Sequence, residues 1–302
     1  MNEYREMIIK AVQESYTEYG FYVRKLTRNN GIEHHCLCAT LGPDIPFAPI
    51  IPCEVYEAGL EVGSWTMNDV LEDVQNLMKQ RMEIGTINLA DFQSIKGKVF
   101  LRVTNYEKNR GNLENVPHRK FLDLVVTYWV ELLCAPGTEG TFLVTNGIMN
   151  CWNTSEEELW ELAYGNTFKK YDVKIYKIVE VLKGILGDIG MDYELPDEQE
   201  FMYVANCEKR VYGATCVLKK EAFRSFAETK GTDLFIIPSS IFECIVICKQ
   251  EDIREETVKR MVKEVTANTT TEESFLSNHV YLYERERDEL KDLCENSAKE
   301  YI

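Results

Sequence analysis

The chain has 302 residues, 45% of them hydrophobic and 28% charged, which allows a sizeable buried core and excludes an intrinsically disordered protein. Its 50 acidic residues outnumber its 34 basic residues and give a net charge of −16, which argues against direct nucleic-acid binding, because that affinity depends on clustered Lys and Arg. No apolar run approaches the roughly 20 residues of a membrane-spanning helix, and the amphipathic first segment is not a targeting peptide. We therefore expect a cytoplasmic protein.

The first predicted elements are a helix, a hairpin and a second helix. Apolar residues recur at helical spacing from about residue 2 to 19. The segments 21–26 and 34–41 alternate as strands do, and an Asn-Asn-Gly turn signal between them predicts a hairpin. Four prolines then favour an extended stretch. An apolar stripe after residue 64 predicts a helix that ends before Gly85.

Strand-forming sequence dominates from Lys96 onward. A helix is expected over residues 155–163, where Ser155 is followed three residues later by a Glu, as in a capping box. Another helix is expected over Tyr171–Ile189, before a polar link. β-branched and aromatic residues predict strands over residues 98–105, 121–133 and 140–146.

The last third repeats this arrangement. Strand pairs followed by helices that cover them describe an α+β fold built on mostly antiparallel sheet. We expect two regions, residues 1–94 and residues 95–302, and the second can consist of two similar halves joined near 190–200. The pattern predicts strands over residues 202–206, 213–218, 234–238 and 243–248, and helices over residues 218–231 and 253–265.

Three predicted strands end in Asn, at Asn105, Asn146 and Asn206. An Asn side chain at a strand end can bond backbone groups freed by the turn. The three residues can therefore line one edge of a sheet as candidate binding residues, or simply form three turns.

Half of the histidines lie in the segment His-His-Cys-Leu-Cys that begins at His34. In a strand, His34, Cys36 and Cys38 share one face, so they are candidate metal ligands. Their side chains would stand about 7 Å apart, too far to close around one zinc ion without a bulge. We therefore expect an ordinary strand, no metal and no cofactor. The ten cysteines are scattered singly, which favours free thiols.

Ser239 and Ser240 follow a predicted strand, and Glu243 and His279 lie further along the chain. These are the residue types of a serine hydrolase, but the GxSxG elbow is absent. The alternative is a corner in which the serines bond free backbone groups.

Asp123 lies in an apolar predicted strand, where a carboxylate must be paired or face outward. We expect a structural ion pair with the neighbouring His118, Arg119 or Lys120.

Several segments resemble, in the same order, blocks of a clostridial family known as domain of unknown function 5688. The family has an ordinary apolar strand where this chain has His34 to Cys38, which favours the strand interpretation. It has a histidine where this chain has Phe242, which weakens the hydrolase interpretation. The resemblance implies a cytosolic protein, often carried on mobile elements, and brings no activity. The blocks are residues 103–124, 142–167, 202–218, 234–247 and 275–290.

The preferred interpretation is a non-enzymatic, cytosolic protein that binds another macromolecule, most simply a protein, as an accessory of a mobile element. A serine-type hydrolase is the first alternative. The second is an acidic inhibitor that imitates nucleic acid, which requires the surplus acidic residues to gather on one face.

Overall fold

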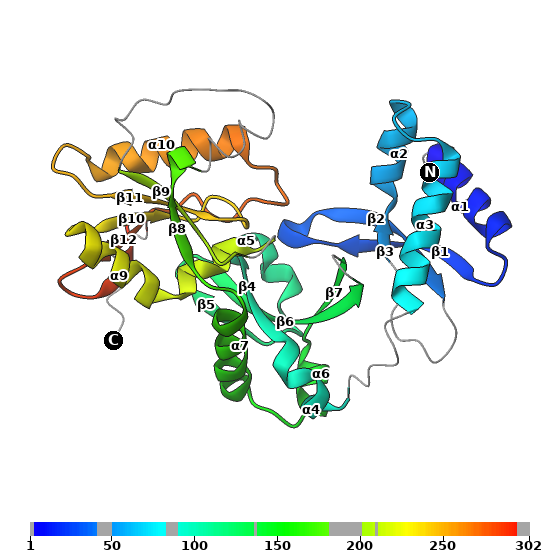
Figure 1. Cartoon of the computed structure of the whole chain (residues 1–302), viewed down its shortest axis with the longest axis horizontal. Coiled ribbons are helices and arrows are strands. Elements are labelled where there is room, and N and C mark those ends of the chain that lie inside the picture. Colours follow the sequence, from blue (N-terminus) through cyan, green and yellow to red (C-terminus); the bar gives the residue numbers. More distant parts are fainter. Residues whose placement is uncertain are drawn as a thin grey trace. The chain divides into compact units, whose positions relative to one another are not determined.

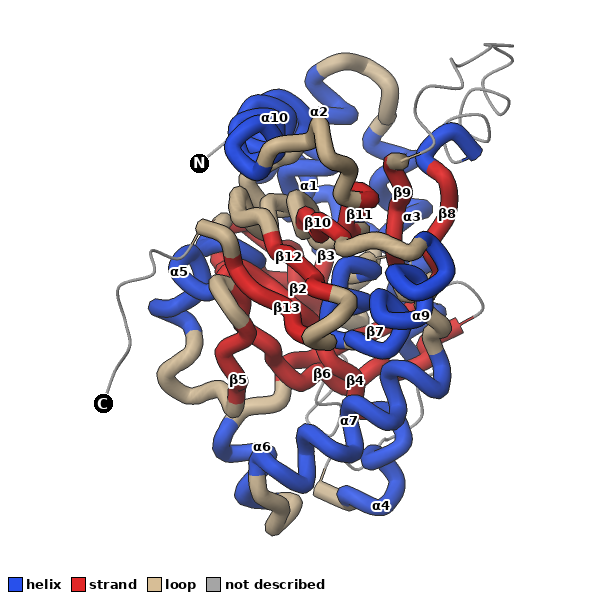
Figure 2. The backbone as a smooth tube through the Cα atoms, turned by 90° about the vertical axis from the view of Figure 1, so that its left-hand side faces the viewer, coloured by secondary structure: helices blue, strands red, loops and turns tan. Residues whose placement is uncertain are grey.

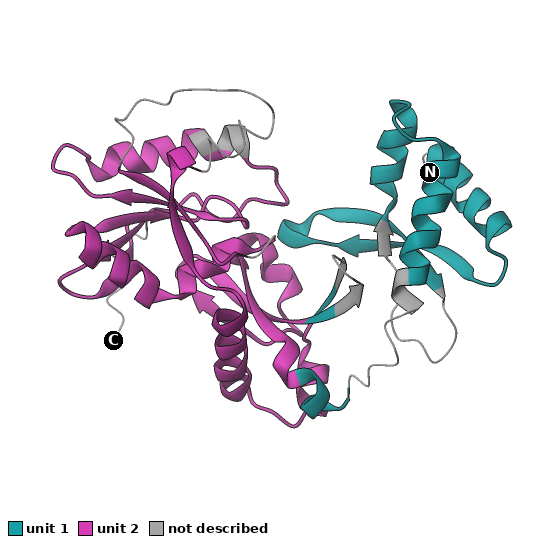
Figure 3. Ribbon diagram, viewed as in Figure 1, with its two compact units in different colours: residues 1–95, 131–142 teal, residues 96–130, 143–302 magenta. Residues whose placement is uncertain are grey.

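The computed structural model describes residues 3–40, 50–82, 90–135, 138–180, 201–208 and 211–294. The fold is α+β, with mostly antiparallel sheets. The chain divides into two compact units, an N-terminal unit of residues 1–95 with 131–142 and a C-terminal unit of residues 96–130 with 143–302 (Figure 3). The joint expected near residues 190–200 lies outside the described residues. No helix in the described ranges is long and apolar enough to cross a membrane.

The N-terminal unit contains the predicted hairpin and both predicted helices. Strand β1 (Gly20–Thr27) pairs antiparallel with β2 (Glu33–Thr40), and β3 (Ile50–Pro52) pairs with β2. The turn holds Asn30 at φ 58° and Gly31 at φ 74°, the left-handed region that Asn and Gly tolerate. The remaining elements are α1 (Glu3–Ser15), η1 (Asn29–Gly31), α2 (Cys53–Glu61), α3 (Met67–Met82) and α4 (Phe92–Ile95).

Helix α1 is shorter than the sequence suggests, because its last aromatic residues form the turn into β1. The rings of Tyr16 and Tyr19 pack against Phe21, with centroids 6.5 and 6.3 Å from it. Residues of α1, the hairpin, α2 and α3 build one apolar core, so the unit can bury its strands without a long sheet. This core consists of Ile8, Val12, Phe21, Leu37, Ala39, Cys53, Tyr56, Val70, Val74 and Met78.

A four-stranded sheet has the order β4-β6-β5, and β7 pairs with β6; residues 131–142, which include the end of β6 and most of β7, are assigned to the N-terminal unit. Helix α7 begins at the predicted capping box of Ser155 and Glu158. It borders the edge strand β4, where Thr167 Oγ1 accepts a bond from Leu101 N and Asn166 Nδ2 donates to Val99 O. The elements are η2 (Lys96–Lys98), β4 (Val99–Asn105), α5 (Tyr106–Asn109), η3 (Arg110–Asn112), β5 (His118–Phe121), β6 (Leu124–Ala135), β7 (Thr138–Leu143), α6 (Asn146–Cys151) and α7 (Glu156–Lys170).

The second sheet has the order β13-β12-β10-β11-β9-β8 and carries a helix on each face (Figure 1). Neighbouring residues on a strand point to opposite faces. Met202 packs into the cluster that holds Val258 and Val262 of α10, whereas Tyr203 contacts Phe226 of α9. The elements are β8 (Lys174–Lys177), β9 (Met202–Asn206), η5 (Gly213–Leu218), α9 (Lys220–Lys230), β10 (Leu234–Ile237), β11 (Cys244–Cys248), α10 (Glu255–Thr269), β12 (Tyr281–Glu284) and β13 (Glu289–Asp292).

Two predicted elements are wrong, and several strands were not predicted, among them β3, β5, β12 and β13. The helix expected over Tyr171–Ile189 is interrupted by β8, whose pairing with β9 overrides local helical spacing. Residues 181–189 lie outside the described part. The strand expected over residues 213–218 is the 3-10 helix η5, since Gly213 packs directly against the Phe242 carbonyl. Strands β12 and β13 extend the sheet beside β10 (Figure 2).

Candidate functional site

Polar side chains far apart in sequence converge on Asp123 in the C-terminal unit. Asp123 lies in the two-residue turn between β5 and β6, where Leu122 has φ 55°. Its Oδ2 accepts a hydrogen bond from Ser277 Oγ at 2.7 Å, and its Oδ1 accepts one from the Tyr281 hydroxyl. The expected ion pair with residues 118–120 is wrong, because the turn directs the carboxylate toward the segment before β12.

His279 lies between two carboxylates. Its Nδ1 is 2.7 Å from Asp292 Oδ2 and 3.8 Å from Asp123 Oδ1. Its backbone N–H donates to Ser277 Oγ, and Asp292 Oδ1 accepts from the backbone N–H of Cys294. The side chain of Asp292 is only 1% exposed, whereas that of His279 is 32% exposed. We call Asp123, Ser277, His279, Tyr281 and Asp292 the Asp123 cluster.

The β12–β13 hairpin explains this arrangement. Tyr281 pairs with Asp292, and a further bond from Leu293 N to Val280 O extends the ladder. Val280 and Leu282 enter the apolar core with α10. Tyr281 lies between these two residues, so its side chain points to the other face of the hairpin. Burial, with the charge of Asp123 added, raises the pKa of Tyr281, so its phenol stays protonated and donates.

Of the predicted hydrolase residues, Ser240 contacts Glu243, whereas His279 contacts Asp292. Ser240 Oγ accepts from Phe242 N at 3.2 Å and also bonds Glu243, whose pKa is raised by burial against the lowering effect of that bond. Among the described residues, no hydrogen bond joins Ser239 or Ser240 to His279. The backbones are adjacent, since Leu276 N donates to Ser239 O. The hydrolase therefore stays a prediction.

Two of the three predicted asparagine corners are confirmed as turns. Asn105 Oδ1 accepts from Lys108 N at the start of α5, and its Nδ2 donates to Leu276 O. Asn206 Oδ1 accepts from Glu208 N. At the third corner, the side chain of Thr145 caps α6 instead of Asn146, because Thr145 holds the extended N-cap conformation. A binding role for these residues stays a prediction.

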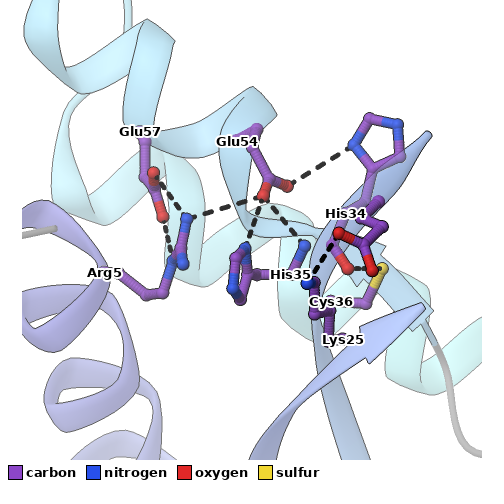
Figure 4. A network of polar contacts seen from close by, with 8 residues as sticks. Arg5, Lys25, His34, His35, Cys36, Glu54 and Glu57 are labelled. Carbon is purple, nitrogen blue, oxygen red and sulfur yellow. Dashed lines mark hydrogen bonds and ion pairs between the residues drawn. The ribbon is translucent and has the colours of Figure 1, made fainter. Parts of the chain in front are cut away.

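The His-His-Cys segment is a strand, as expected, and both histidines contact Glu54 at the start of α2 (Figure 4). His35 donates its backbone N–H to Glu54 Oε1 at 2.8 Å, and its Nδ1 lies 3.2 Å from the same atom. His34 Nδ1 is 3.7 Å from Glu54 Oε2.

The sulfur atoms of Cys36 and Cys38 contact backbone carbonyls, and burial raises the pKa of both thiols. Within the described residues, His34 and these two cysteines do not form a group with the spacing of metal ligands.

The inner face of α2 is fixed by buried contacts. The guanidinium of Arg5 makes two bonds to Glu57, and Nη2 of Arg5 lies 3.5 Å from Glu54 (Figure 4). The Tyr56 hydroxyl donates to Asp73 of α3 at 2.6 Å. Gly59 admits the Trp65 ring so closely that a Cβ there would lie 2.8 Å from it.

The outer face of α2 is apolar and exposed. Val55 is 56% exposed, Val62 directly after the helix is 76% exposed, and Ala58 between them is also exposed. Positions i, i+3 and i+7 lie on one side of a helix. We call Val55, Ala58 and Val62 the α2 stripe. Each residue turns the helix by about 100°, which places Glu54 and Glu61 along one side of the α2 stripe.

The comparisons with known proteins identify a family. The family model described as a family of unknown function (DUF5688) matches residues 1–285. No curated protein and no solved structure matches the chain.

Proposed function

We propose that this chain, which belongs to the DUF5688 family of unknown function, is a cytoplasmic protein that acts by binding another protein. The α2 stripe carries the proposal. Single exposed apolar residues are normal on a protein surface, whereas a row of them on an exposed helix face is typical of an interaction site. A role as an accessory of a mobile element belongs to the same proposal and derives from the family resemblance.

The stripe has the spacing by which one helix face docks into an apolar groove of a partner. Val55 and Val62 would be the anchors, and Ala58 between them lets the partner approach closely. Because Glu54 and Glu61 border the stripe, a groove flanked by Lys or Arg is the complementary surface. The expected partner is therefore a protein with an apolar groove and a basic rim.

The fixed inner face supports this function. Helix α2 has only nine residues, and an isolated helix of this length is unstable in water. The bonds of Arg5 to Glu57 and of Tyr56 to Asp73 hold it in place before a partner arrives. A surface that is already ordered loses less conformational entropy on binding.

The test compares two matched Val→Glu variants of the full chain. Wild type, Val62→Glu and Val211→Glu are used as bait in a host lysate, with recovered proteins measured by quantitative mass spectrometry. Val211 is an exposed valine of the C-terminal unit, so it controls for the added charge. We expect a partner whose recovery falls at least about tenfold for Val62→Glu and is unchanged for Val211→Glu, a loss of about 1.4 kcal/mol. Equal recovery with all three baits, or recovery of the bait alone, would refute the proposal.

A further inference from the structure

We propose that His279, Asp292 and Cys294 form a binding site for a divalent transition metal of the zinc type. A ring nitrogen of His279, a carboxylate oxygen of Asp292 and the sulfur of Cys294 all lie within 4.8 Å of one another. In the described part of the chain, no other three residues of these types do so. The site lies in the C-terminal unit, so it is independent of the α2 stripe.

The spacing of the three donors is close to that of a metal site. Zinc binds nitrogen and oxygen at about 2.0–2.2 Å and sulfur at about 2.3 Å, so tetrahedral ligand atoms stand about 3.3–3.6 Å apart. The 2.7 Å between His279 Nδ1 and Asp292 Oδ2 must widen by about 0.6 Å. The sulfur, at most 4.8 Å from the other donors, must approach by about 1.2 Å or less. Side-chain rotations of this size need no change in the strands.

The hairpin supplies the rigidity that such a site needs. His279 lies just before β12. Asp292 is the last residue of β13, and Cys294 follows it by two residues. The bond from Leu293 N to Val280 O keeps these two chain ends together. Because the other face of the hairpin packs into the core with α10, the three donors are held on a fixed frame.

The donor chemistry selects the class of metal. A thiolate, an imidazole and one carboxylate suit zinc and related transition metals, whereas magnesium and calcium prefer oxygen ligands alone. The side chain of Asp292 is almost completely buried, so its charge requires compensation from the groups around it. Asp123 Oδ1, 3.8 Å from His279 Nδ1, adds a second negative charge beside the site. Three protein ligands leave one coordination position for water or another ligand.

The alternative to a metal site is that the buried carboxylate of Asp292 only orients the ring of His279. Cobalt distinguishes the two, because a cobalt–thiolate bond gives a near-ultraviolet charge-transfer band and tetrahedral Co²⁺ gives intense visible bands. The full chain, freed of metal with a chelator, is titrated with Co²⁺ and then with Zn²⁺. We expect one equivalent of Co²⁺ with both signals, and displacement of Co²⁺ by Zn²⁺.

Two ligand variants and two controls assign the site. Cys294→Ser should abolish the charge-transfer band, and His279→Gln should weaken Co²⁺ binding at least about tenfold. Cys151→Ser, at an exposed cysteine, and His118→Gln should bind as wild type does. Absence of stoichiometric Co²⁺ binding, or a band that survives Cys294→Ser, would overturn the proposal.

Alkylation of the unmodified chain gives a second readout that requires no variant to fold. Cys294 is partly exposed, so iodoacetamide can reach its thiol. With Zn²⁺ bound, mass spectrometry should show at least about tenfold slower alkylation of Cys294, because the thiolate is then a ligand. Cys151 is the internal control and should react at the same rate with and without Zn²⁺. Equal rates at Cys294 would contradict the proposal.

Discussion

Replacing Arg5 by Met should destabilise the N-terminal unit. The side chains of Arg5 and Glu57 are 10% and 8% exposed, and two bonds join them. The pair is therefore buried, and the values of about 0–1 kcal/mol measured for surface ion pairs do not apply to it. In Arg5→Met, Glu57 keeps its buried position and loses both hydrogen bonds from the guanidinium.

The loss of one partner of a buried pair sets the size of the effect. Removing one partner of a buried ion pair costs about 3–5 kcal/mol, because the other charge stays buried without it. We therefore expect Arg5→Met to lower the free energy of unfolding by about 3–5 kcal/mol at pH 7. Arg5→Met/Glu57→Leu removes both partners and should lie within about 1 kcal/mol of wild type.

Hydrogen exchange measured by mass spectrometry is the appropriate assay, because it reports the opening of α1 and α2 separately from the C-terminal unit. Exchange rates are compared for the wild type, the single variant and the double variant at pH 7. A loss of less than about 1 kcal/mol in the single variant would refute the reasoning. So would a double variant as unstable as the single one.

Two further predictions concern the C-terminal unit. Gly213→Ala should lower the free energy of unfolding by about 1–3 kcal/mol, because the added Cβ would lie 2.2 Å from the Phe242 carbonyl oxygen. Gly147→Ala is the control and should be tolerated, since its Cβ would meet no atom closer than 3.7 Å. Thermal unfolding of both variants checks this prediction. Burial alone would raise the pKa of Glu156, but its bonds to Arg119 and Tyr128, together with nearby positive charge, lower that pKa overall. The stabilising contribution of Glu156 is therefore present above the ordinary carboxyl pKa and is lost as the pH falls through the lower folded value. In urea unfolding, Glu156→Gln should therefore be less stable than wild type at pH 7, and the gap should narrow toward pH 3; a gap independent of pH would contradict this.

Local signals predicted the elements whose bonds are made within a few residues. The Asn-Asn-Gly turn between β1 and β2 and the capping box at Ser155 were confirmed. Helix α2 was not predicted, since Val55, Ala58 and Val62 make its outer face apolar and remove the alternation that marks a surface helix.

The Asp123 cluster could not be read from the sequence. Asp123 and Ser277 are 154 residues apart, and the obvious partners of Asp123 were its charged neighbours at 118–120. His279 was selected as a candidate, but its contact with Asp292 depends on the β12–β13 hairpin, which the charged segment 284–289 concealed. A strand pair of four residues each has too few positions for alternation to be recognised.

The amino-acid sequence by itself determined the class of fold, the turns and the caps, because these depend on backbone preferences and on bonds that span three or four residues. Only the tertiary structure decided which polar side chains meet. The carboxylate of Asp123 finds its partners across two sheets of the C-terminal unit, and the histidines of β2 find Glu54 on a helix that local patterning missed. A buried charge must be matched by whatever the fold places beside it, and that neighbour is set by strand order and register, which no local pattern encodes.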